Sequence, residues 1–195
     1  MDAPAPSYYD RTLLLVEDQP LLALDEGRRL RKRGFRVEVV YSGEEAVERA
    51  VHDDAIDLIL MDIDLGEGMD GTEASRIILS RRSVPIVFLT SHSEQEMVER
   101  VRNITRYGYV LKDAGDFVLV STIEMAFDLF EAHRRTAEKE KRLAEAERIA
   151  HLGSWELDIP TGRCYWSDEF FRICGYEPGM FQPTIQDGFK LIHPE

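Results

Sequence analysis

The chain has 195 residues, of which 44% are hydrophobic, and it carries a formal net charge of −13. This length exceeds the roughly 100 to 150 residues of a typical domain, so we expect one complete domain and a smaller second segment. The acidic charge argues against binding to nucleic acid or to anionic membrane surfaces, because both need clustered basic residues. No apolar run approaches the ~20 residues of a membrane span and no signal peptide opens the sequence, so we expect a cytoplasmic protein.

Strand-like and helix-like segments alternate over the first 130 residues. Short, continuously apolar runs predict parallel strands that are buried on both faces, at residues 12–16, 36–41, 56–61, 86–90 and 108–111. Helical patterns at 20–33 and 42–51 separate the first three runs, and Pro20 suits a first helical turn. The alternation predicts a doubly wound α/β sheet of five parallel strands in the order 2-1-3-4-5, which is a flavodoxin-like arrangement.

Four of the apolar runs end in reactive side chains, namely Glu17-Asp18, Asp62, Thr90 and Lys112. Ligands of such sheets bind outside the carboxyl ends of the strands, and strands one and three are neighbours in this order. Glu17, Asp18 and Asp62 therefore share one crevice, where each pair of carboxylates at ~4 Å would repel by about 4 kcal/mol. The carboxylates call for a divalent cation, and their oxygen ligands favour Mg²⁺, with Mn²⁺ as a substitute.

The chain resembles the receiver domain of two-component response regulators over about residues 11–130, on the ordered set Glu17-Asp18, Asp62, Thr90, Tyr109 and Lys112. The resemblance implies that Asp62 accepts a phosphoryl group from a sensor histidine kinase or a phosphotransfer protein. It implies that Asp18, Asp62, Glu17 through water and the backbone carbonyl of Asp64 hold Mg²⁺. Lys112 and Thr90 would contact the phosphoryl group, and Tyr109 would act with Thr90 as a conformational switch. Such a domain is regulatory rather than enzymatic, although it assists its own phosphorylation and dephosphorylation.

Two departures from the usual receiver pattern lie near this site. Asp113 follows Lys112 where many receivers have proline, so no cis peptide is expected there. The loop 63–71 is one residue longer than usual and has Gly66 where proline is frequent, so we expect it to be more acidic and more mobile.

Other classes of protein use some of the same residues. Asp62 and Asp64 resemble the nucleophile and acid pair of haloacid-dehalogenase-like phosphatases, although in those enzymes the further acids follow the lysine. Asp62, Asp64 and Glu73 also match positions 1, 3 and 12 of a calcium-binding loop. Glu67 then stands at position 6, where that loop requires glycine. A phosphorylation-independent dimerisation scaffold is the alternative without phosphoryl chemistry.

Basic residues gather near the end of the first predicted helix, at Arg28, Arg29, Arg31, Lys32, Arg33 and Arg36. A solvated last turn that complements the helix dipole explains them. The resemblance offers a second reading, because the first helix of receivers also docks the kinase.

One long helix is predicted from residue 116 to about residue 150. Its first part, up to Phe130, has apolar spacing suited to packing on the sheet. Beyond it, a heptad pattern runs through Met125, Leu129, Ala132, Thr136, Leu143, Ala146 and Ala150, with Lys139 as an interruption. We expect a homodimer through a parallel coiled coil along 116–150, with a solvated monomeric helix as the alternative.

Residues 151–195 change character and become rich in aromatic side chains. Residues 152–158 and 163–166 read as two strands joined by a turn, and Ser167 caps a short helix. This succession resembles the opening of a PAS sensor domain, for which no ligand can be named. We thus expect a tail at 1–10, the receiver at 11–130, a helical linker at 131–150 and a truncated PAS segment at 151–195. An output domain, in which kinase activity is one option, is expected elsewhere in a larger protein.

Overall fold

A computed structural model describes residues 8, 10–91, 104 and 107–192 of the chain. The chain forms two compact units, Met1–Ala132 and His133–Glu195. Within the described ranges, no helix is both long enough and apolar enough to cross a membrane.

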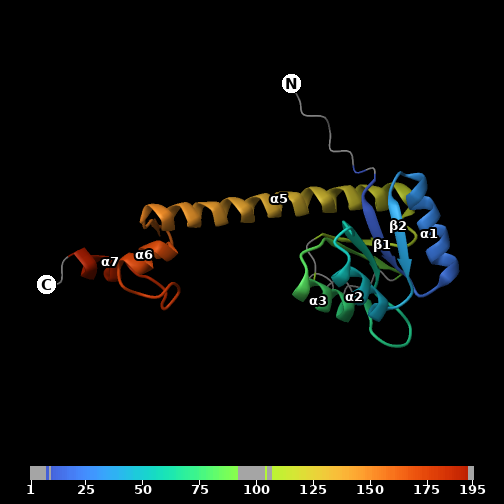
Figure 1. Ribbon diagram of the computed structural model, residues 1–195, viewed down its shortest axis with the longest axis horizontal. Helices are drawn as coiled ribbons and strands as arrows, with labels where there is room; N and C mark the ends of the chain where they lie inside the picture. Colours follow the sequence, from blue (N-terminus) through green and yellow to red (C-terminus); the bar gives the residue numbers. More distant parts are fainter. Residues whose placement is uncertain (1–7, 9, 92–103, 105–106, 193–195) are drawn as a thin grey trace, which may run out of the picture. The chain divides into compact units, whose positions relative to one another are not determined.

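The first unit is built on a five-stranded sheet in which all neighbouring strands are parallel (Figure 1). Its strands are β1 (Thr12–Val16), β2 (Arg36–Val40), β3 (Leu58–Asp62), β4 (Ile86–Thr90) and β5 (Tyr109–Leu111). The observed order β2-β1-β3-β4-β5 confirms the predicted flavodoxin-like sheet. β3 begins two residues later than predicted, because its pairing with β1 starts at Leu58 opposite Leu13. Just before it, the Asp57 carboxylate accepts a hydrogen bond from the Thr12 backbone N–H at 2.8 Å.

Helices cover both faces of this sheet (Figure 1). They are α1 (Pro20–Lys32), α2 (Gly43–His52), α3 (Gly71–Arg81) and the long α5 (Gly115–Ala150). Core residues of α1 and α5 pack on one face, and those of α2 and α3 pack on the other. Ser42 caps α2 by accepting from the Glu45 N–H, as its residue type favours. Residues 92–103, which follow β4, lie outside the described residues.

Burial explains why the strands read as continuous apolar runs. Every residue of β1, β3 and β4 is buried, because helices cover both faces of these central strands. Each fully buried leucine, isoleucine or phenylalanine contributes about 1.5 to 3 kcal/mol. The carboxyl ends of these rigid strands are therefore well placed to hold a site.

Tyr8 packs on α5 where that helix passes the sheet. Its ring stacks on Phe127 with centroids 5.3 Å apart, and its hydroxyl donates to the Asp128 carboxylate. Burial and this acidic partner raise the pKa of Tyr8 to about 12. The Arg11 guanidinium lies 5.5 Å from the centre of the same Phe127 ring and pairs with Asp57 at 2.7 Å. Tyr8 and Arg11 thus both contact the first half of α5.

The second unit holds a hairpin and two short helices. β6 (Trp155–Asp158) and β7 (Arg163–Trp166) pair in antiparallel fashion, followed by α6 (Asp168–Ile173) and α7 (Ile185–Ile192). Ser167 caps α6 by accepting from the Phe170 N–H, as predicted. Trp166 contacts the rings of Phe170, Phe171 and Phe181, which form a small aromatic core. Trp155 stays 62% exposed, so much aromatic surface faces solvent.

Candidate functional site

Three carboxylates meet at the carboxyl ends of β1 and β3. These strands are adjacent, with Val16 beside Met61, so Glu17, Asp18 and Asp62 follow at one edge of the sheet. One ligand oxygen from each of the three side chains lies within 4.8 Å of the others. The sequence predicted this juxtaposition, which arises because parallel strands end on the same side.

Lys112 enters the same group from the segment after β5. Its backbone N–H donates to the Thr90 carbonyl at 2.9 Å, which fixes the lysine beside β4. Its Nζ donates to Asp62 Oδ2 at 2.8 Å and also to Glu17 Oε2. In the described part of the chain no peptide bond is cis, which includes the bond between Lys112 and Asp113. One ammonium group thus bridges two of the acids.

Burial shapes the electrostatics of this cluster. Asp62 is 2% exposed, and burial raises its carboxyl pKa above the ordinary value, with repulsion from Glu17 adding to the effect and Lys112 opposing it. Burial lowers the Lys112 pKa, but hydrogen bonds to Asp62 and Glu17 outweigh it, so the net direction is upward. The Lys112 ammonium therefore opposes, without cancelling, the effect of burial on the Asp62 carboxyl.

The acids fit a divalent cation. Asp18 Oδ1 is buried and makes no hydrogen bond to the described residues, although buried polar atoms usually have partners. From the described residues, Asp62 Oδ1 accepts one long hydrogen bond, 3.3 Å from the Asp64 N–H. Carboxylate oxygens with free lone pairs are the donor set that Mg²⁺ prefers.

Glycines let the neighbouring loop pass close to the acids. A Cβ on Gly71 would lie 1.9 Å from the Asp62 carbonyl oxygen, so no side chain fits at the start of α3. Gly66 has φ of +66°, and a Cβ there would lie 2.9 Å from Asp18 Oδ2. Gly71 is therefore required by contact with the backbone of Asp62, and Gly66 is favoured by its left-handed backbone conformation.

Thr90 and Tyr109 lie on β4 and β5, the two strands that follow β3 in the sheet order. Thr90 ends β4, is buried and pairs with Leu111, the residue before Lys112. Tyr109 begins β5 opposite Phe88 and is 44% exposed. Of the expected switch pair, Thr90 is therefore buried and Tyr109 is partly exposed in this structure.

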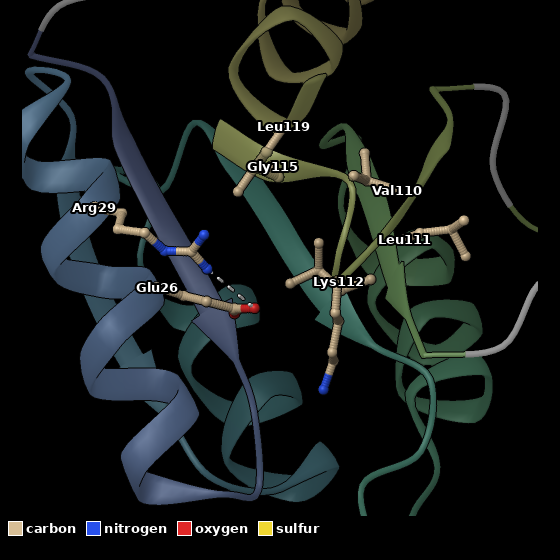
Figure 2. A pocket seen from close by; sticks show the side chains of 8 residues that line it. Glu26, Arg29, Val110, Leu111, Lys112, Gly115 and Leu119 are labelled. Atoms are coloured by element: carbon tan, nitrogen blue, oxygen red, sulfur yellow. Dashed lines mark ion pairs between the residues drawn. The ribbon is translucent and has the colours of Figure 1, made fainter. Parts of the chain in front are cut away.

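Sequence reasoning missed one acidic residue near the site, Glu26 of α1. It is 5% exposed and lines a pocket with Lys112 (Figure 2). Burial, followed by repulsion from Glu17, raises its pKa to about 7. A signal for it was present, because Glu26 occupies the buried stripe of α1 together with Ala23, Gly27 and Leu30.

Comparisons with known proteins agree with this geometry. Residues 13–124 match the family pattern described as response regulator receiver domain. The transcriptional regulatory protein PdtaR of Mycobacterium tuberculosis is 36% identical over 131 residues, covering 66% of this chain and 60% of PdtaR. The chain spans between 30% and 60% of the length of the curated relatives to which it was matched.

Two solved structures show the same likeness. The N-terminal domain of a three-domain response regulator/sensory box/GGDEF protein from Carboxydothermus hydrogenoformans is 45% identical, with a TM-score of 0.59, and covers 63% of this chain and 98% of that domain. The receiver domain of sensor histidine kinase PA1611 from Pseudomonas aeruginosa, with magnesium coordinated in its active-site cleft, is 30% identical, with a TM-score of 0.54. It covers 60% of this chain and 97% of that receiver.

Proposed function

Because this chain belongs to the response regulator receiver domain family of two-component signalling, we propose that its Asp62 accepts a phosphoryl group from a sensor histidine kinase or a phosphotransfer protein. The observation that carries the proposal is the position of Asp62, between the acids of β1 and the Lys112 ammonium. Receivers are regulatory phosphoacceptors, so the modified carboxylate is a signal and not the product of an enzyme.

The residues of the cluster have complementary roles in the transfer. An Asp62 carboxylate oxygen attacks phosphorus while the bond from phosphorus to the donor's imidazole nitrogen breaks, which leaves an aspartyl phosphate. Lys112 is already within 2.8 Å of Asp62 Oδ2 and moves to a phosphoryl oxygen as a mobile point charge. Catalysis of this kind rests on positioning and charge neutralisation, which a preformed ion cluster supplies.

We assign the metal site to Asp18, Asp62, Glu17 through water and the backbone carbonyl of Asp64. Mg²⁺ fits the donor set, and Mn²⁺ is a plausible substitute. When bound, the cation neutralises charge on the phosphoryl oxygens. Asp18 Oδ1, which has no hydrogen-bond partner among the described residues, supports this assignment.

Thr90 and Tyr109 carry the change of state. The Thr90 hydroxyl donates a hydrogen bond to a phosphoryl oxygen, and this movement of Thr90 leaves space beside β5. Tyr109, 44% exposed before phosphorylation, turns inward to fill that space. The surface of the receiver then differs between the two states.

The changed surface passes its state through α5 to the segment after it. The hairpin β6–β7 and α6 fit the opening of a PAS sensor domain. We name neither a ligand for it nor the output domain. The Carboxydothermus hydrogenoformans relative also combines a receiver with a sensory box. We therefore place this chain in a phosphorelay that ends in an output beyond these residues.

Labelling with acetyl phosphate tests the assignment of Asp62. With Mg²⁺ present, we expect acid-labile phosphate to approach one per chain, to vanish in Asp62→Asn and to be lost when EDTA removes the metal. Asp54→Asn, an exposed aspartate before β3, is the matched control and should be labelled normally. Multiple turnover on phosphomonoesters would identify a phosphatase instead. A chain that takes up no phosphate would support the phosphorylation-independent dimerisation scaffold.

Light scattering tests the proposed homodimer through the helix. Leu143 lies at a heptad position of α5 and is 62% exposed, so it is free to meet a second copy. We expect twice the chain mass for the natural sequence and a monomer for Leu143→Lys. Ile149→Lys changes a residue of comparable exposure, 71%, outside the heptad positions and should leave the dimer intact. A monomeric natural chain would contradict the coiled coil.

A further inference from the structure

Glu26 is a buried acid that the proposed phosphoryl transfer does not use. Its pocket is lined mainly by apolar side chains of β4, β5 and α5, including Leu89, Val110 and Leu119. Its Oε2 is buried and makes no hydrogen bond to any described residue. Leaving a buried carboxylate oxygen without a partner typically costs about 1 to 3 kcal/mol or more. This position therefore weakens the fold, which suggests another role.

The Glu26 carboxylate has two cations within electrostatic range. Lys112 lines the same pocket and lowers the Glu26 pKa, although its Nζ is hydrogen-bonded to Asp62 and Glu17. Arg29, one turn further along α1, has Nη2 4.0 Å from Glu26 Oε1 (Figure 2). Glu17 and Asp62 are the acids that face Glu26 and repel its charge.

Arg29 also reaches the first turn of α5. Its Nη1 donates to Asp116 Oδ1 at 2.9 Å. Its Nε lies 3.2 Å from Asp25 Oδ2 but makes no hydrogen bond there. One guanidinium is thus shared among three acids and is only partly satisfied by them. The network is only partly buried, because the side chains of Arg29 and Asp116 are 32% and 34% exposed, so the guanidinium has room to shift between its acidic partners.

We propose that Glu26 is a positioning residue which, through Arg29, couples the place of the Lys112 side chain to the first turn of α5. The proposal rests on the proposed function, because a phosphoryl group on Asp62 is what draws the Lys112 ammonium away. Among the described residues, Arg29 is then the cation that remains near Glu26. When the Arg29 guanidinium moves toward Glu26, it moves away from Asp116. Phosphorylation therefore loosens the first turn of α5.

Amide hydrogen exchange of the whole chain, with and without acetyl phosphate and Mg²⁺, tests this coupling. In the natural sequence, phosphorylation should lower severalfold the protection factors of the amides of residues 119–122, which are the first to bond to carbonyls of the opening turn of α5. In Glu26→Gln, at least half of that change should vanish, although phosphate still enters Asp62. Asp116→Asn removes the ion pair between Arg29 and Asp116, and the phosphorylation-dependent change in protection should fall by a similar amount. Asp25→Asn, which removes an exposed partner of Arg29, should keep the response.

The pH dependence separates positioning by charge from a merely structural effect. Phosphorylation should lower the amide protection at the start of α5 more at pH 8, where Glu26 is charged, than at pH 6. In Glu26→Gln, the two pH values should give the same result. Equal responses in the natural chain, Glu26→Gln and Asp116→Asn, with phosphate present on all three, would overturn the coupling alone. A natural chain that takes no phosphate would overturn the proposed function and the coupling with it.

Discussion

Replacing Lys112 with alanine should lower the free energy of unfolding by about 3 to 5 kcal/mol in metal-free buffer. Lys112 is 14% exposed at its side chain and is the hydrogen-bonded cation of Asp62 and Glu17, both of which are almost fully buried. Without it, two buried carboxylates face each other uncompensated. The Asp62 pKa should then rise further, because the lysine is what holds it down. Urea unfolding, followed by amide exchange of β1 and β3, measures the loss in this unit.

Millimolar Mg²⁺ should restore part of the lost stability, because a cation among the same acids replaces the missing charge. Lys32→Ala provides the matched control, since Lys32 is an exposed lysine in the last turn of α1. Its effect should stay within about 0.5 kcal/mol. A Lys112→Ala chain as stable in EDTA as the natural sequence would show that the ion cluster contributes nothing net to folding.

Replacing Glu26 with glutamine should stabilise the first unit at pH 8 by up to about 3 kcal/mol. The folded chain raises the Glu26 pKa from an ordinary 4.5 to about 7, so between these values it holds a proton that the unfolded chain has released. The favourable contribution of protonated Glu26 is complete below pH 4.5 and is lost as the pH rises through 7. Glutamine keeps the shape of the protonated acid at every pH.

Unfolding free energies at pH 5 and pH 8 check this sign. Natural chain and Glu26→Gln should differ little at pH 5 and most at pH 8. Asp25→Asn, on the same helix but 64% exposed at its side chain, should show no comparable trend. A constant difference between the two chains across this range would mean that Glu26 titrates normally in the fold.

The sheet and the meeting of its polar ends were predictable from local pattern. Continuous apolar runs such as 12–16 and 86–90 became strands with the predicted bounds, because only a strand covered on both faces buries every side chain. The approach of Asp62 to Glu17 followed from strand order alone, since parallel strands deliver their carboxyl ends to one edge.

Long-range charge pairing was not predictable in the same way. Arg29 fitted a solvated last turn of α1, yet it pairs with Asp116, which lies 87 positions later in the chain. Glu26 was overlooked because glutamate on a helix is ordinarily assigned to solvent. Its position on the buried stripe of α1 was a local signal, but the packing of α1 near β5 and α5 that encloses its carboxylate is a long-range contact. The pairing of Tyr8 with Asp128 is of the same kind.

The contact of Tyr8 with α5 bears on where this domain can be cut. The family pattern covers 13–124, which leaves out Tyr8 and Arg11 at one end and Phe127 and Asp128 at the other. Phe127 is 2% exposed, so its ring belongs to the core although it lies outside the pattern. A version trimmed to 13–124 would remove both halves of this packing at once. The smallest independent piece therefore needs to start before Tyr8 and to continue past Glu131, which pairs with Arg11.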